Sequence, residues 1–181
     1  MTDDLALLRA LAQGERAAFG TLYARFSERV YNTALSYTQR VPDAEEVTQD
    51  VCVKVYRGAA QFKGKSSVAT WIYRITVNTA LNALAKRKRR TTDPLDTTVP
   101  DFDHPGIALE KREAARELFR VIHTLPDSQK TAFLLSYVEE LPRQEVADIM
   151  ETTLKSVESL LQRAKHNLRK RLKNAYPHRR K

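Results

Sequence analysis

The chain has 181 residues, of which 42% are hydrophobic and 29% are charged, a balance typical of a globular protein. It contains no apolar run close to the roughly 20 residues that cross a bilayer, and its acidic start is unlike a secretory signal, so we expect a cytoplasmic protein without membrane insertion. A single cysteine and four scattered histidines exclude an internal disulfide and argue against a metal site or a cofactor.

The net charge of +9 is distributed unevenly along the chain. Residues 1–90 carry +7, residues 91–106 carry −4, and residues 107–181 carry +6. A merely soluble basic protein would spread its charges more evenly. Lysine and arginine clusters bind polyanions because each neutralised phosphate releases a counterion, so the two basic blocks favour a nucleic acid as partner.

Two long amphipathic helices are predicted at the start of the first block. Apolar residues at three- and four-residue steps indicate a core helix: Phe19, Leu22, Tyr23, Phe26, Val30, Tyr31, Ala34 and Leu35. Pro42 and Asp43 then mark the start of a second helix, with Asp43 as its N-cap. Its apolar side comprises Ala44, Val47, Val51, Val55 and Ala59, and its polar side comprises Glu45, Glu46, Gln49, Asp50, Lys54 and Arg57.

A third helix is expected to begin near Val68, after a polar loop at residues 61–67. It carries Trp71, which we expect in the core because large aromatic side chains on an amphipathic helix usually pack inward, and it ends in a basic run at residues 86–90. Residues 91–106 contain three prolines and no positive charge, so they are predicted to form an extended linker.

The second block, residues 107–181, is also predicted to be helical, with a break at Leu125-Pro126-Asp127. A short helix at residues 143–150, a tight turn and a long helix to about Leu172 predict a helix-turn-helix, the unit whose second helix enters the DNA major groove. Thr153 is the expected N-cap of that second helix. No segment alternates with period two, so we expect an all-α chain of two small helical domains joined by an acidic linker.

The last helix has one apolar stripe, formed by Val157, Leu161, Ala164, Leu168 and Leu172. Polar residues lie opposite that stripe: Lys155, Ser159, Gln162 and His166, with Ser156 and Arg163 on one flank and Glu158 on the other. Such side chains can contact base edges or phosphates in the major groove. From spacing alone, a solvated face on an ordinary helix explains the pattern equally well.

At this point the chain resembles the extracytoplasmic-function sigma factors, the small members of the sigma-70 family, over nearly its whole length. The segment DAEEVTQD at residues 43–50 and KVYR at residues 54–57 resemble the helix with which that family docks onto core RNA polymerase. The resemblance implies that Glu46, Gln49, Asp50 and Arg57 form the docking face. A solvated helix side would account for the same residues without any partner.

The segment TWIYRITVN at residues 70–78 and the residues after it resemble the family's segment for the melted minus-ten element. The resemblance implies that single-stranded DNA contacts Lys63, Lys65, Arg74, Asn78 and Asn82. The second block resembles the domain that reads the minus-thirty-five element, which implies DNA contacts for Lys155, Ser156, Ser159, Gln162 and Arg163. The family also implies promoter DNA and an anti-sigma factor as partners, and no catalysis.

Two other functions remain open from the residues alone. A stand-alone helix-turn-helix regulator would explain the C-terminal block and would use the first block for sensing or dimerisation. A metal-dependent nuclease would use Glu45, Glu46 and Asp50, but no histidine or carboxylate from a second segment completes such a site. Binding to core polymerase distinguishes a sigma factor from both alternatives.

Overall fold

The computed structural model describes residues 3–90 and 112–175, and every regular element in these ranges is a helix. The expected all-α fold is therefore confirmed. The chain divides into two compact units, Met1–Phe102 and Asp103–Lys181. The expected linker, residues 91–106, lies outside the described residues, so its boundaries stay a prediction.

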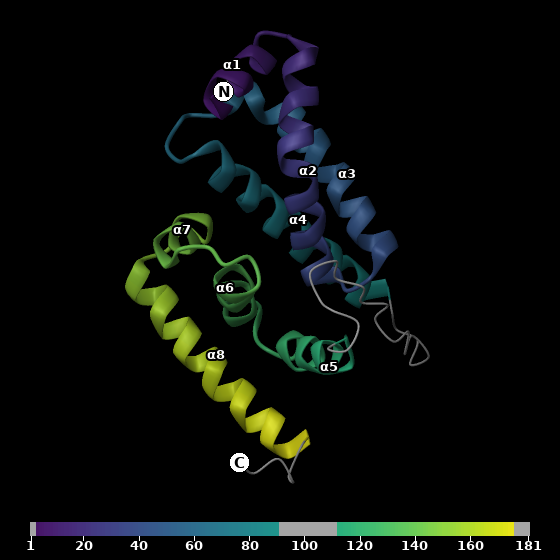
Figure 1. The fold of residues 1–181 in the computed structure, drawn as a ribbon, viewed down its shortest axis with the longest axis vertical. Helices are drawn as coiled ribbons and strands as arrows, with labels where there is room; N and C mark the ends of the chain where they lie inside the picture. Colours follow the sequence, from purple (N-terminus) through teal and green to yellow (C-terminus); the bar gives the residue numbers. More distant parts are fainter. Residues whose placement is uncertain (1–2, 91–111, 176–181) are drawn as a thin grey trace. The chain divides into compact units, whose positions relative to one another are not determined.

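The first unit is a bundle of three long helices with a short helix at one end. Its elements are α1 (Asp4–Ala12), α2 (Arg16–Thr38), α3 (Val41–Gly58), the single 3₁₀ turn η1 (Ala59–Gln61) and α4 (Val68–Arg90). Helices α2, α3 and α4 pack against one another, and α1 contacts the start of α2 and η1 (Figure 1). The core contains Leu22, Leu35, Val47 and Val51, all at most 2% exposed. Burial of each such side chain stabilises the fold by about 1.5–3 kcal/mol.

The apolar side predicted for α3 is the side that the bundle buries. Ala44, Val47, Val51 and Val55 are all buried, and Ala59 of η1 continues the same stripe. The predicted N-cap was wrong, because α3 begins at Val41 with Pro42 in its first turn and Arg40 at the N-cap position. Asp43 lies in the first turn, where its carboxylate still favours the positive end of the helix dipole.

Helix α1 and the cap of helix α4 were not predicted from the sequence. Helix α1 packs Leu7, Leu8 and Leu11 into the bundle, and the ion pair between Arg25 and Asp4 holds it against α2. Helix α4 begins at Val68 as expected, and Ser67 caps it, because the Ser67 Oγ accepts a hydrogen bond from the Thr70 backbone N–H at 3.0 Å.

The second unit is built around one long helix. Its elements are α5 (Arg112–His123), α6 (Asp127–Tyr137), α7 (Arg143–Ile149) and α8 (Leu154–Ala175), and α8 contacts the other three (Figure 1). Val146, Ala147 and Ile149 of α7 are buried, as are Val157 and Leu161 of α8. Ala147 has no exposed surface, which fits the close crossing expected of α7 and α8.

The predicted helix-turn-helix is present. Helix α7 ends at Ile149, a short turn follows, and α8 begins at Leu154. Thr153 caps α8 as predicted, because the Thr153 Oγ1 accepts a hydrogen bond from the Ser156 N–H at 3.2 Å. Glu151, in the turn, has a left-handed backbone with φ of 51°.

Glu140, between α6 and α7, also has a left-handed backbone, with φ of 54°, and its side chain is exposed. A residue with a Cβ is strained there by about 1–2 kcal/mol, whereas glycine is not. We expect Glu140→Gly to stabilise the second unit by about 0.5–1 kcal/mol, after the extra chain entropy that glycine brings to the unfolded state. The measurement is the unfolding midpoint by far-UV circular dichroism.

Glu140→Ala is the matched control for this substitution, since it removes the carboxylate and keeps the strain. Trp71 is the only tryptophan and lies in the first unit, so its fluorescence reports the first unit separately. A glycine variant no more stable than the alanine variant would contradict the expectation.

Candidate functional site

The polar side of α3 forms one exposed face. Glu46, Gln49, Asp50 and Arg57 are all exposed, opposite the buried stripe of the helix. Gln49 and Asp50 follow Glu46 by three and four residues, so both lie next to Glu46 on the helix surface. Arg57 follows Asp50 by seven residues, which places it on the same side about 10 Å along the helix axis. We call these four residues the docking face, after the role that the family resemblance implies for them.

An apolar groove adjoins the docking face, and sequence reasoning missed it. Phe19 and Tyr23 of α2 and Cys52, Val53 and Tyr56 of α3 line a groove of about 530 Å³, with Thr48, Gln49 and Arg57 also in its lining. The predicted core position of Tyr23 was wrong, since Tyr23 is 50% exposed; Val53 and Tyr56 are 46% and 45% exposed. The Phe19 ring packs edge-on against the Tyr56 ring, with 5.4 Å between the ring centres, and this contact stabilises one wall of the groove.

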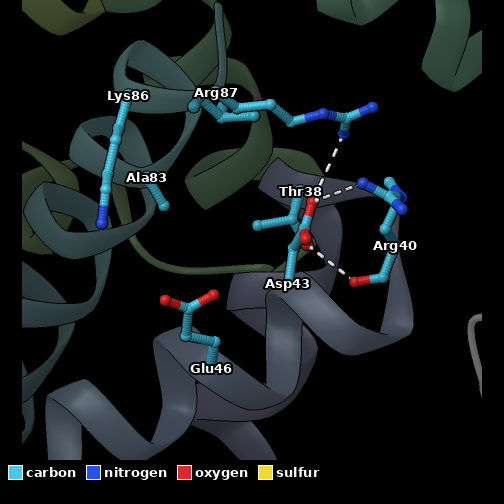
Figure 2. A pocket seen from close by; sticks show the side chains of 8 residues that line it. Thr38, Arg40, Asp43, Glu46, Ala83, Lys86 and Arg87 are labelled. Carbon is cyan, nitrogen blue, oxygen red and sulfur yellow. Dashed lines mark hydrogen bonds and ion pairs between the residues drawn. The ribbon is translucent and has the colours of Figure 1, made fainter. Parts of the chain in front are cut away.

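Asp43 ties the start of α3 to the basic end of α4. Its Oδ2 accepts from Arg40 Nη1 at 3.4 Å and from Arg87 Nη1 at 3.3 Å. Figure 2 shows Glu46 and Lys86 extending into the same pocket from α3 and α4. Farther along the two helices, Lys54 Nζ donates to Thr79 Oγ1 at 2.8 Å. These contacts set the docking face in a defined position relative to α4.

One side of α4 presents the residues predicted to contact the minus-ten element. Arg74, Asn78 and Asn82 recur every four residues, so they share a side of the helix. Asn78 and Asn82 are exposed and Arg74 is half-buried, whereas Ile72 and Val77 are buried. No acidic residue occurs anywhere in α4, and its last five residues are all lysine or arginine. This side therefore combines amide groups with positive charge.

The loop before α4 holds the other two predicted residues. Lys63 and Lys65 are exposed and flank Gly64, whose φ of 67° is a conformation that residues with a Cβ rarely adopt. The Phe62 ring packs 5.2 Å from the Trp71 ring, which anchors the loop to α4. Trp71 was expected in the core, but it is only partly buried, against Phe62 and the close backbone of Gly58.

The exposed side of α8 carries most of the residues predicted for the minus-thirty-five element. Lys155, Ser159, Gln162 and Arg163 are exposed. Arg163 donates to the Ser159 backbone oxygen at 3.3 Å and to the Ser159 Oγ at 3.2 Å, so these two side chains are held together. Ser156 is half-buried beside the Thr153 cap, which makes it the least accessible of the five.

Two further exposed residues of α8 bear on this surface. Leu154, the first residue of the helix, is 41% exposed and was not considered from the sequence. Glu158 Oε1 lies 3.8 Å from Arg143 Nη1, the first residue of α7. On the adjoining side of α8, Lys165 Nζ lies 4.8 Å from the centre of the Tyr137 ring. Hydrogen bonding from Lys165 to the Tyr137 hydroxyl lowers the pKa of that hydroxyl.

Neither a cluster of metal-ligating side chains nor a membrane-spanning helix is found among the described residues. They contain no group of three or more histidine, cysteine, aspartate or glutamate side chains placed to hold a metal ion. None of the described helices has the length and apolarity needed to cross a membrane.

Comparison with known families matches both units. Residues 22–90 match the model of sigma-70 region 2, and residues 115–168 match that of sigma-70 region 4. The chain is 32% identical to the ECF RNA polymerase sigma-E factor of Haemophilus influenzae, over 93% of this chain and 95% of that protein. It is 28% identical to the RNA polymerase sigma-H factor of Pseudomonas aeruginosa, over 93% of each chain.

A solved structure supports the same fold. The sigma factor RpoE of Bartonella quintana, in complex with the anti-sigma factor NepR, matches with a TM-score of 0.68 and 20% identity over 86% of this chain and 96% of that one. The chain belongs to the extracytoplasmic-function group of the sigma-70 family. The alternative of a stand-alone helix-turn-helix regulator is not supported, because it leaves the region 2 match unexplained.

Burial raises the pKa of the Cys52 thiol above its ordinary value of 9.0. A raised pKa leaves less thiolate at neutral pH, and the thiolate is the nucleophile. We expect iodoacetamide to alkylate Cys52 in the folded protein several-fold more slowly than it alkylates free cysteine. The rate should rise with pH to a midpoint above 9.0.

The unfolded chain in denaturant is the control for alkylation, and Cys52 is the only cysteine, so the reaction has a single site. The unfolded chain should react at the rate of free cysteine. A midpoint below 9.0 in the folded protein would contradict the burial argument.

Proposed function

We propose that this protein binds core RNA polymerase in the cytoplasm and directs it to particular promoters, without catalysing a reaction itself. The observation that carries the proposal is that one chain matches both sigma-70 regions and exposes polar side chains on α3, α4 and α8. Each face comes from the exposed side of a helix whose opposite side is buried, so partners can reach it without unfolding the bundle.

The docking face of α3 is our proposed contact with core polymerase. Glu46 and Asp50 supply negative charge and Arg57 supplies one positive charge, so the face suits a mainly basic partner surface. The adjoining groove supplies the apolar contact surface that the polar face lacks. Exposed tyrosines such as Tyr23 and Tyr56 are the kind of side chain that contributes most to binding energy when a partner covers it.

The exposed side of α4 and the loop before it are our proposed contacts with the melted minus-ten element. Single-stranded DNA needs positive charge for its phosphates and polar or aromatic groups for its unstacked bases. Lys63, Lys65 and Arg74 supply the charge, and Asn78 and Asn82 supply amide groups. Trp71 is held by Phe62 and is therefore a support for the loop in this proposal.

Helix α8 is our proposed reader of the minus-thirty-five element. Its exposed Lys155, Ser159, Gln162 and Arg163 provide donors and acceptors for base edges and phosphates. We further propose that an anti-sigma factor regulates the protein, since a structurally similar sigma factor was solved with one. An antagonist of this kind would compete with polymerase if it covered the docking face or the groove.

Reversing the charge of Asp50 tests the docking face. We expect Asp50→Lys to weaken binding to core polymerase by roughly 100-fold or more, because like charges placed opposite each other cost several kcal/mol at an interface. Fluorescence anisotropy of the labelled full chain titrated with core enzyme measures the affinity. Asp50 is exposed, so circular dichroism should show an unchanged fold.

Glu28→Lys is the matched control, because Glu28 is an exposed acidic residue of α2 outside the docking face. It makes the same change in net charge and should leave core binding within a few-fold of the original. Undiminished co-purification of Asp50→Lys with core polymerase would overturn the proposed docking face.

Substitutions in α8 test the promoter contact. We expect Gln162→Ala to lower run-off transcription from a cognate promoter by relaxing selection at one base position. Lys155→Ala should lower transcription more uniformly across promoters, because Lys155 is expected to neutralise a phosphate. The slope of the logarithm of the DNA-binding constant against the logarithm of the salt concentration should become shallower by about one. The measurement is transcription with purified core polymerase from promoters isolated from a genomic fragment library. Unchanged promoter selection by both variants would remove α8 from the proposal.

A further inference from the structure

Glu158 stands out on α8 because it is the only acidic residue of that helix. Its neighbours on the exposed side are Lys155, three residues before it, and Gln162, four residues after it. These separations place the three side chains on one continuous ridge. A carboxylate therefore lies between Lys155 and Gln162 along the helix, at one flank of a surface that otherwise offers positive and neutral groups.

The ion pair with Arg143 does not account for this carboxylate. The two side chains are each 52% exposed, and the 3.8 Å between Arg143 Nη1 and Glu158 Oε1 is too long for a hydrogen bond. An exposed pair of this kind contributes little to stability. It does tether the carboxylate to the first turn of α7, and it leaves the second carboxylate oxygen available to another donor.

A carboxylate in the major groove is repelled by the phosphates and by most base edges. Guanine presents the acceptors N7 and O6 there, and thymine presents the acceptor O4, so neither can donate to Glu158. Adenine presents the N6 amino group, but its N7 acceptor lies beside that donor and repels a carboxylate, whereas cytosine presents the N4 amino group without an adjoining acceptor and is the base that glutamate accepts from in the major groove. A lone carboxylate thus favours cytosine and also disfavours its competitors.

We propose that Glu158 is a specificity-determining residue that selects cytosine at one position of the minus-thirty-five element. The proposal rests on the function proposed above, because it requires α8 to lie in the major groove of promoter DNA. It assigns opposite roles to neighbouring residues: Lys155 raises affinity for any sequence, and Glu158 lowers affinity for the wrong ones. Arg143 is a positioning residue for the carboxylate.

The experiment uses the full chain with core polymerase and promoters whose minus-thirty-five element is randomised, followed by sequencing of the transcripts. The original protein should show one position where cytosine is preferred by roughly 5- to 100-fold, the usual range for one specific base contact. Glu158→Ala should reduce that preference below about 3-fold while binding to random DNA stays equal or rises. Glu158→Gln should shift the preference toward adenine, since glutamine pairs with the N6 and N7 edge.

Two controls separate a base contact from simpler effects. Glu140→Gln removes the same charge from an exposed residue of the same unit outside α8, and it should leave the cytosine preference unchanged. Arg143→Gln should weaken the preference only partly, because the carboxylate remains. If Arg143→Gln abolished the preference as fully as Glu158→Ala, the direct contact would be overturned.

The outcomes also distinguish this inference from the function on which it rests. A protein that selects a defined minus-thirty-five element, with Glu158→Ala selecting the same bases, keeps the proposed function and overturns the role of Glu158. A protein that supports no selective transcription with core polymerase overturns both. Melting curves of each variant, matched to those of the original chain, exclude loss of fold as the cause.

Discussion

The buried stripe of α3 is the constraint on which the first unit depends. Ala44, Val47, Val51 and Val55 fill the space between α2 and α4, and each is nearly or fully buried. A rotation of α3 by one residue, about 100°, would push Asp50 of the docking face toward the core in one direction and Glu45 in the other. Burying an unpaired charge is far more costly than burying valine is favourable, so the rotation of the helix is firmly fixed. The docking face is thus a consequence of core packing.

Contacts between α3 and α4 extend this constraint to the exposed side of α4. Asp43 accepts from Arg87 near the end of α4, and Lys54 donates to Thr79 nearer its middle. Each contact is partly exposed and contributes modestly to stability. Their value lies in geometry, because two tethers along one pair of helices resist both sliding and rotation. Under the proposed function, polymerase binding to α3 would therefore place Asn78 and Asn82 of α4 in a defined position.

Sequence reasoning succeeded where one helix determines the outcome by itself. The periodicity of residues 44–59 predicted which side of α3 is buried, and the same argument predicted the buried side of α8. It failed where two segments must meet. The groove needs Tyr23 from α2 beside Tyr56 from α3, and no pattern in either helix reveals that pairing. Asp43 was predicted to be a cap because it follows Pro42 at the start of a helix, and its contact with Arg87, 44 residues away, was not foreseen.

Short elements and half-buried side chains were the other limits. Helix α1 has only nine residues, too few for its periodicity to stand out, although Leu7, Leu8 and Leu11 have the right spacing for one buried side. The Trp71 ring is neither fully buried nor fully exposed, because it packs against the backbone of Gly58, and the sequence does not predict that contact. The roles proposed for the exposed residues of α3, α4 and α8 come from family resemblance, because exposure alone does not distinguish a contact residue from a solvated one.

The positive charge of the second unit does not by itself explain how particular promoters would be selected. Lysine and arginine bind any DNA, so a surface made only of them would hold polymerase at random sites as firmly as at promoters. Selection requires side chains that tolerate few bases, and these must be held rigidly enough to penalise the wrong ones. Under the proposed function, helix α8 meets both needs, because its buried stripe fixes its rotation and its exposed side interrupts positive charge with Ser159, Gln162 and Glu158. The basic residues would then supply affinity for DNA, and Ser159, Gln162 and Glu158 would determine which sequence is bound.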